Sequence, residues 1–260
     1  MVKKIGLFWL KDDFRLKRNI ALSEATNNHD QVVAFYLYKQ KDFESKKAQK
    51  WWIGRSLEEF RERLTELNIN LEIIKTDTYK VFFEKLFNEN NFSIYWNRTY
   101  EPSYLKFDEY LSKNFQKNNI HFKISKGNIL NEHQDVKKKD GTPFKVFTPF
   151  WRIAENFYLE KIPTKQSKIL KCKNKITYFK KTLKETEIYP QKKWYQKFEK
   201  YWSPSEKVAL SELKSFLNKR VESYSDARNF PSILGTSKLS PYIKHGQIHV
   251  ETIWEECSKI

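Results

Sequence analysis

The fold is decided in residues 5–38, which read IGLFWLKDDFRLKRNIALSEATNNHDQVVAFYLY. This stretch contains two nearly continuous apolar runs, Ile5–Leu10 and Val32–Tyr38, with a more polar segment between them. Strands without polar alternation are typical of parallel sheets, because helices cover both faces of such a sheet. Further runs of this kind follow at Leu71–Lys75, Ser93–Trp96 and His121–Ser125.

Helical periodicity fills the intervals between these runs. The clearest example has apolar residues three or four positions apart and charged residues on the opposite face: Ile53, Leu57, Phe60, Leu64 and Leu67. Val81, Phe82 and Leu86 indicate another helix, and residues 102–115 a third. The alternation predicts an α/β fold, a Rossmann-like five-stranded parallel sheet with helices on both faces.

The pattern changes after residue 130. Periodicity fades over 131–200, which we interpret as a long interdomain linker. Within it, residues 161–200 hold 13 basic and three acidic side chains. This excess indicates either a surface that faces phosphates or a solvated, Lys-rich connection.

A new helical pattern begins near residue 201. Ser203 can cap a helix, Pro204 suits its first position, and Glu206 would close a capping box. The apolar stripe of this helix is Leu210, Leu213, Leu217 and Val221. We therefore expect an α/β domain at 1–130, a linker at 131–200, and the beginning of an all-α domain at 201–260.

Composition excludes several classes of protein. Hydrophobic residues make up 39% and aromatic residues 16% of the 260 positions, which excludes a disordered chain. No apolar run approaches the roughly 18 residues of a membrane span. Two cysteines cannot build a disulfide framework, and the N-terminus has no cleavage site for secretion. We expect an unsecreted, cytoplasmic protein in a reducing compartment, without contact with a membrane.

Charge and motif content narrow the chemistry further. The net charge is +17, but only nine of the 49 basic residues are Arg, which weakens the inference of a nucleic-acid partner. The six glycines are scattered singly, so neither a G-x-G-x-x-G turn nor a Walker loop can form. His245 and His249 have metal-ligand spacing but no third ligand, and we expect no metal.

Three stretches resemble one family, the DNA photolyases and cryptochromes. They are residues 8–22 (FWLKDDFRLKRNIAL), residues 141–150 (GTPFKVFTPF), and residues 224–231 with 235–242 (YSDARNFP and GTSKLSPY). The last pair is the most specific. Lys11 stands where members usually have Arg, and Lys244-His245 stands where they have His-Phe.

The resemblance implies a light-driven flavoprotein. Its members use reduced FAD to repair cyclobutane pyrimidine dimers by electron transfer to a dimer flipped out of damaged DNA. We expect such a photolyase, acting as a monomer; the alternatives are a cryptochrome-like photoreceptor and a non-enzymatic chromophore-binding module. Members typically continue for about as many residues again, so we expect a truncated form, with the electron-transfer tryptophans beyond Ile260 and with repair by this chain alone in doubt.

The flavin motif has chemistry of its own. Hydroxyl groups of Thr236, Ser237 and Ser240 precede Pro241, so backbone N–H groups at a helix N-terminus could face a diphosphate. The alternative is an ordinary turn with Ser240 as the N-cap. The resemblance adds Lys238 and Leu239 to this FAD site.

Two further residues of the same motif have implied roles. By the resemblance, Tyr224 would pack on the flavin, and Arg228 would contact the DNA lesion. The alternative for Arg228 is a salt bridge with Asp226 or Glu222.

A second chromophore is implied at the end of the fourth predicted strand. Open α/β sheets place ligands at the carboxyl ends of their strands, where Glu101 lies. By the resemblance, this is the site of an antenna chromophore such as methenyltetrahydrofolate. The Glu101 carboxylate could accept paired N–H bonds from a pterin ring, or could merely favour the N-terminus of the next helix.

Overall fold

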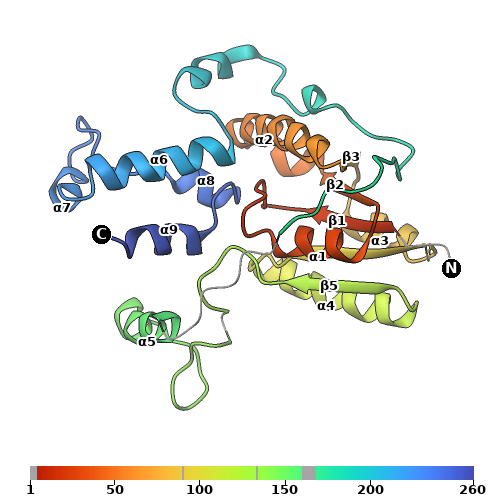
Figure 1. Ribbon diagram of the computed structural model, residues 1–260, viewed down its shortest axis with the longest axis horizontal. Helices are drawn as coiled ribbons and strands as arrows, with labels where there is room; N and C mark the ends of the chain where they lie inside the picture. Colours follow the sequence, from red (N-terminus) through yellow and green to blue (C-terminus); the bar gives the residue numbers. More distant parts are fainter. Residues whose placement is uncertain (1–4, 90, 133, 160–167) are drawn as a thin grey trace.

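A five-stranded parallel sheet organises the computed structural model, which describes residues 5–89, 91–132, 134–159 and 168–260 (Figure 1). The strand order is β3-β2-β1-β4-β5. The strands are β1 Ile5–Leu10, β2 Val32–Tyr38, β3 Asn70–Lys75, β4 Phe92–Asn97 and β5 His121–Ser125. The predicted fold is confirmed, and three of the five strands have the predicted bounds. β3 and β4 gain one or two residues at their ends.

Helices join the strands and continue beyond the sheet. The α-helices are α1 Ile20–Asn28, α2 Lys47–Glu66, α3 Tyr79–Leu86, α4 Pro102–Lys117, α5 Phe147–Leu159, α6 Glu206–Lys219, α7 Tyr224–Ala227, α8 Ser240–Lys244 and α9 Val250–Cys257. Short 3-10 helices lie at η1 Gln40–Phe43, η2 Glu185–Glu187 and η3 Lys193–Lys200. In the described part of the chain, no helix is both long and apolar enough to cross a membrane.

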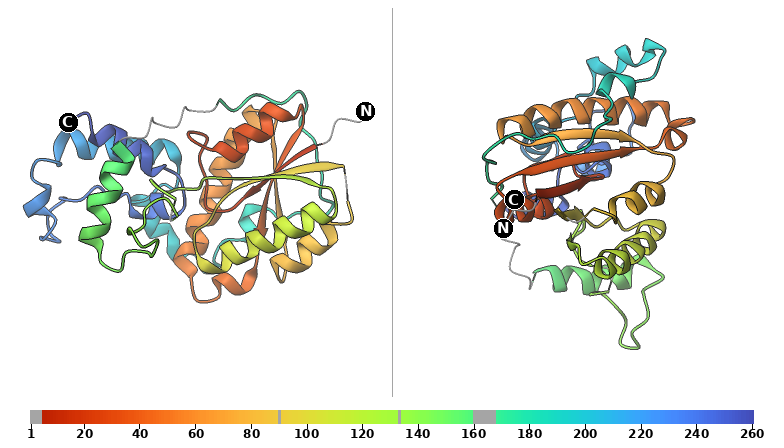
Figure 2. Two further views of the ribbon diagram at one scale, coloured as in Figure 1. Left: turned by 90° about the horizontal axis from the view of Figure 1, so that it is seen from below. Right: turned by 90° about the vertical axis from the view of Figure 1, so that its right-hand side faces the viewer.

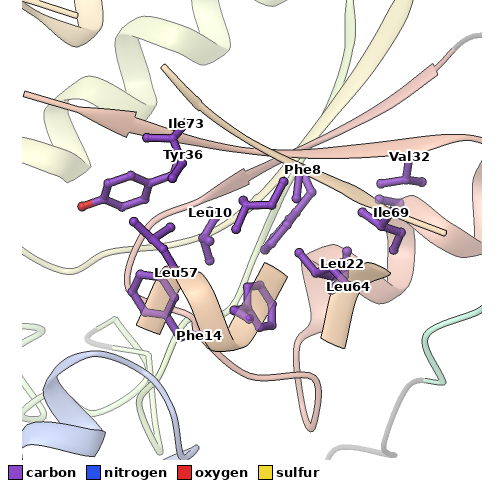
Figure 3. Packing of buried hydrophobic residues seen from close by; sticks show 14 of the residues in the cluster. Phe8, Leu10, Phe14, Leu22, Val32, Tyr36, Leu57, Leu64, Ile69 and Ile73 are labelled. Carbon is purple, nitrogen blue, oxygen red and sulfur yellow. The ribbon is translucent and has the colours of Figure 1, made fainter. Parts of the chain in front are cut away.

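Both faces of the central strands β2, β1 and β4 are buried, as their continuous apolar runs predict, whereas the edge strand β5 is partly exposed, because it has a neighbouring strand on one side only. In β1, Phe8 and Leu10 point to the face covered by α1 and α2, whereas Leu7 and Trp9 point to the face covered by α3 and α4. Figure 2 shows helices on the two sides of the sheet, and Figure 3 shows the first cluster, in which Leu57 of α2 packs with the strands. Successive strand side chains alternate between faces, so a doubly covered strand must be apolar throughout.

The segment after β5 is more structured than the predicted linker. It contains α5, η2 and η3, and part of it crosses the open edge of the sheet at β3. The buried Glu72 carboxylate of β3 accepts hydrogen bonds from the backbone N–H groups of Tyr178 (2.9 Å) and Phe179 (2.7 Å), and Leu183 N–H donates to Ile73 (2.7 Å). Covering an edge strand in this way removes its unpaired backbone groups from solvent.

Helices α6, α8 and α9 gather beside one end of the sheet (Figure 1). Their apolar side chains meet Trp51 and Trp52 of α2 in one buried cluster, which also contains Leu213, Tyr242 and Ile248. Trp51 and Trp52 therefore cover most of the predicted stripe of α6, at Leu210, Leu213 and Leu217, whereas Val221 lies beyond the end of the helix.

The predicted capping box at the start of α6 is wrong. The N-cap is Ser205, whose hydroxyl accepts from Val208 N–H (3.1 Å), so the helix begins two residues later than Pro204 would place it. Glu206 does not fold back on the cap. Its carboxylate accepts from the backbone N–H groups of Leu16 (2.8 Å) and Lys17 (3.0 Å), because those donors in the loop after β1 have no other acceptor in the described chain.

Candidate functional site

The order in which successive strands are added to the sheet reverses between β1 and β4. The loops that follow these two strands therefore diverge at this point. In open α/β sheets, such a switch point forms a crevice that binds ligands. Asp12 follows β1, and Glu101 follows β4 just before α4. Asn97, at the end of β4, joins the two sides, because its amide donates to Asn19 (2.9 Å) and accepts from Ala21 N–H (3.1 Å).

A cavity of about 500 Å³ lies at this switch point, and we call it the switch-point cavity. Five aromatic side chains form much of its wall: Tyr36, Phe43, Tyr79, Tyr104 and Phe107. Among its charged lining residues, Lys39 pairs with Asp42 (2.9 Å) and lies 4.2 Å from the centre of the Tyr79 ring. Flat aromatic walls with a few charged groups suit a planar heteroaromatic ligand.

A second cavity of about 430 Å³ adjoins the first, and Asp12, Glu101 and Lys244 line both. Asp12 has a carboxyl with a perturbed pKa. Burial, partly opposed by Lys244, raises its pKa to about 6. A titratable group with a perturbed pKa in a cleft is typical of a binding or catalytic site.

Glu101 lies where the sequence placed it, at the mouth of this site. It is the N-cap residue of α4, but its side chain makes no cap hydrogen bond. Instead its carboxylate pairs with Lys244 of α8 at 3.5 Å, and both side chains are more than half exposed. The structure therefore brings Glu101 to a cavity, although a bond to a pterin remains a prediction.

The residues of the predicted flavin motif lie together at α7, α8 and the loop between them. Thr236, Lys238 and Ser240 are exposed, whereas Leu239 is buried. Leu239, not Ser240, is the N-cap of α8, so the alternative in which Ser240 is an ordinary N-cap is wrong. Ser237 folds locally: its hydroxyl accepts from Leu239 N–H at 3.4 Å.

Tyr224 and Arg228 lie near each other on the same exposed surface. The Arg228 guanidinium lies 5.5 Å from the centre of the Tyr224 ring, and Tyr224 is 37% exposed. Within the described residues, Arg228 has no ion pair with Asp226 or Glu222. Local pairing therefore does not occupy its guanidinium.

Most residues that line the switch-point cavity were absent from the predicted site, among them Tyr36, Lys244 and His245. Tyr36 carried a usable signal, because it lies near the carboxyl end of a predicted strand. Lys244 and His245 carried none, since the packing of α8 beside β1 joins residues more than 200 positions apart.

His249 has a structural role, and its buried contacts predict that the stability of the protein depends on pH. Its Nδ1 accepts from Glu251 N–H (3.1 Å), and Nε2 lies 3.2 Å from the Gly127 carbonyl, so the neutral ring satisfies both contacts. Burial, together with Arg15, lowers its pKa from 6.5 to about 2. Below pH 6.5, His249 is protonated in the unfolded chain but stays neutral in the folded chain. The free energy of unfolding therefore decreases as pH falls.

We therefore expect wild type to lose about 2 kcal/mol more stability than His249→Asn when pH falls from 7 to 5, at about 1.4 kcal/mol per pH unit below 6.5. Asn can retain the cap of α9 without titrating. Urea unfolding of both proteins at several pH values measures the difference. Parallel stability curves would contradict the prediction.

Fold and cavity together define a doubly wound α/β protein with an aromatic-walled cavity at its switch point. Sequence comparison identifies the family: a family model described as DNA photolyase matches residues 6–167. This chain belongs to the DNA photolyase family.

Individual relatives agree with this assignment. A deoxyribodipyrimidine photo-lyase of Agrobacterium fabrum is 27% identical over 249 residues, which cover 95% of this chain and 52% of the relative. Cryptochrome-2 of Arabidopsis thaliana is 24% identical over 266 residues, which cover 99% of this chain and 43% of the relative. The crystal structure of a class III photolyase from Agrobacterium tumefaciens superposes with a TM-score of 0.85 at 25% identity, covering 98% of this chain and 53% of that one. The chain spans about half the length of these relatives.

Proposed function

We propose that this chain is the chromophore-binding α/β part, with the first flavin contacts, of a photolyase that repairs cyclobutane pyrimidine dimers in DNA under blue light. The observation that carries the proposal is the family match over residues 6–167, combined with the motif at 235–242. FAD would supply the electron that cleaves the dimer, and the protein would position FAD and tune its electronics.

The flavin motif supports FAD binding by its exposed polar groups. Thr236, Ser237, Lys238 and Ser240 offer hydroxyl, ammonium and backbone N–H donors, and Leu239 contributes its backbone. Lys238 adopts φ +54°, an uncommon conformation that turns the loop sharply before α8. Tyr224 lies in α7, the helix that precedes this loop, and its exposed ring could pack on the isoalloxazine.

Arg228 supports contact with damaged DNA, since the residue is exposed and its guanidinium lies over the exposed Tyr224 ring. The Lys-rich segment supports such contact less well. Lys173 pairs with Asp30 (3.2 Å) and Lys175 donates to Thr65 (3.1 Å), which favours a solvated connection. The part of this segment at 161–167 lies outside the described residues.

Two other functions fit the same family. A cryptochrome-like photoreceptor would hold the same flavin but leave lesions intact. The similarity to a plant cryptochrome supports this alternative. A chromophore-binding module without flavin would use the switch-point cavity alone.

The decisive experiment uses the protein purified from its own gene. Its absorbance is recorded at 350–500 nm, and it is illuminated with DNA that contains pyrimidine dimers. A flavin spectrum with light-dependent loss of dimers supports the photolyase, a flavin spectrum with intact dimers supports the photoreceptor, and no flavin supports the module.

For residues 1–260 expressed alone, we expect neither one FAD per chain nor repair. Tyr224 and most of the polar loop are exposed, so a few diphosphate contacts without burial of the ring cannot offset the cost of association. One flavin per chain together with repair would refute this expectation.

We also expect Glu101→Ala to lower occupancy of a near-ultraviolet second chromophore about tenfold. The substitution removes the carboxylate that could accept N–H bonds, and it frees Lys244 at the mouth of both cavities. Reconstitution with methenyltetrahydrofolate and absorbance at its near-ultraviolet band measure the occupancy. Glu109→Ala, also on α4 but away from the switch-point cavity, is the matched control. Equal occupancy in the two variants would contradict the role of Glu101.

A further inference from the structure

His245, a buried histidine on the wall of the switch-point cavity, has ring nitrogens that the fold does not use. The side chain follows α8 and is only 6% exposed. Its ring stacks on Trp52, with centroids 5.9 Å apart and an interplanar angle of 24°. Neither nitrogen has a hydrogen-bond partner among the residues that the structure describes, and Nδ1 is fully buried. A phenylalanine could provide the same stacking.

An unpaired polar group in this position requires an explanation. Leaving a buried donor or acceptor without a partner costs about 1–3 kcal/mol, and such groups are rare in native proteins. Where the group lines a cavity, a ligand is a natural partner. The packing function alone does not account for an imidazole.

The backbone holds this ring in place. The His245 carbonyl accepts from Phe14 N–H (3.5 Å), and the next carbonyl, of Gly246, accepts from Arg15 Nη1 (2.9 Å). Gly246 has φ +65°, and a Cβ there would lie 1.8 Å from the backbone oxygen of Asp12. Only glycine permits this approach, so α8 and the loop after β1 are locked together. A ligand would meet a side chain that is already ordered, which lowers the cost of binding.

The charge state of the ring suits hydrogen bonding to a neutral heterocycle. Burial, followed by the charge of Lys244, lowers the pKa of His245 to about 4. The ring is therefore neutral at pH 7, with one N–H donor and one lone-pair acceptor. The Asp12 carboxyl lines the same cavity and has no hydrogen-bond partner within the described chain, so it offers a complementary acceptor.

We propose that His245 is the specificity-determining residue of the switch-point cavity, where it hydrogen bonds to the polar edge of a planar heteroaromatic chromophore while Asp12 accepts from a ring N–H. The matching ligand class has adjacent carbonyl and N–H groups on a flat ring, an edge that pterins and flavins share. Tyr36, Tyr79 and Tyr104 supply the aromatic walls against which such a ring packs. This inference rests on the proposed function of the cavity as a second chromophore site.

The test compares wild type, His245→Phe and His245→Gln in binding to two probes, methenyltetrahydrofolate and flavin mononucleotide. We expect wild type to bind one probe, and the identity of that probe distinguishes the pterin from the flavin. His245→Phe should bind it at least tenfold more weakly, whereas His245→Gln, which keeps a donor and an acceptor, should recover most of the affinity.

A spectroscopic readout separates hydrogen bonding from packing. The absorption maximum of the bound probe should shift in His245→Phe, because a hydrogen bond to the ring perturbs its electronic transition. Without ligand, the thermal midpoint of His245→Phe should equal or exceed that of wild type, since an unpaired polar atom is removed. Unchanged affinity and absorption in His245→Phe would overturn the inference alone. Failure of wild type to bind either probe would overturn the proposed function of the cavity as well.

Discussion

Replacing Asp108 with alanine is expected to destabilise the protein by about 3–5 kcal/mol, because the change leaves a buried ammonium without its counter-ion. Lys11 is 6% and Asp108 is 4% exposed, and their charged atoms lie 3.7 Å apart between α4 and the sheet. Burial lowers the pKa of Lys11 and raises that of Asp108, so each charge depends on the other. Asp108 also accepts from Trp96 Nε1 at 2.9 Å, and that donor would lose its partner too.

Guanidinium chloride unfolding measures this loss. The matched control is the double variant Lys11→Met with Asp108→Asn, which removes both charges but keeps an acceptor for Trp96 Nε1, and it is expected to lie within about 1 kcal/mol of wild type. A single Asp108→Ala variant that is as stable as the double variant would show that Lys11 does not need its partner.

Replacing Glu206 with alanine is expected to cost about 2–4 kcal/mol and to loosen the contact between α6 and the loop after β1. The buried carboxylate satisfies the backbone N–H groups of Leu16 and Lys17 and also pairs with Arg63 of α2. The two N–H donors are partly buried, and each one that loses its acceptor costs up to about 1–3 kcal/mol. The three contacts therefore tie the helical end of the chain to the α/β part.

Amide hydrogen exchange reports on this contact directly, since Leu16 and Lys17 should exchange faster in Glu206→Ala while the strands retain their protection. Glu212→Ala, on the same helix, is the control: its partner Arg220 is 3.6 Å away and Glu212 is 37% exposed, so we expect a loss below about 1 kcal/mol. Equal losses for the two variants would assign the effect of Glu206 to the helix rather than to the loop.

The fold could be predicted from the sequence because its signals are local. β1 and β2 have the predicted bounds since a strand buried on both faces needs an unbroken apolar run. The helix around Leu57 could be predicted from the spacing of its apolar residues alone. Glu101 followed from its position after a strand, because parallel strands bring their carboxyl ends to one edge of the sheet.

Polar contacts between distant segments could not be predicted. Glu206 looked like part of a capping box, since the local pattern allowed it, yet its carboxylate binds donors 190 positions earlier in the chain. His245 lines the cavity only because α8 packs against Trp52. The predicted linker proved to cover β3 because Glu72 offers an acceptor that two of its N–H groups can reach.

Local patterns in the sequence encode the sheet, its covering helices and the strand ends at which the cavity lies. Apolar periodicity encodes which residues are buried, and burial is a property of each element separately. Which polar side chains line the cavity, and which become structural partners, depends on how distant segments pack together. A hydrogen bond requires two groups at about 3 Å with the correct orientation. For groups on distant segments, that geometry exists only after the elements have packed.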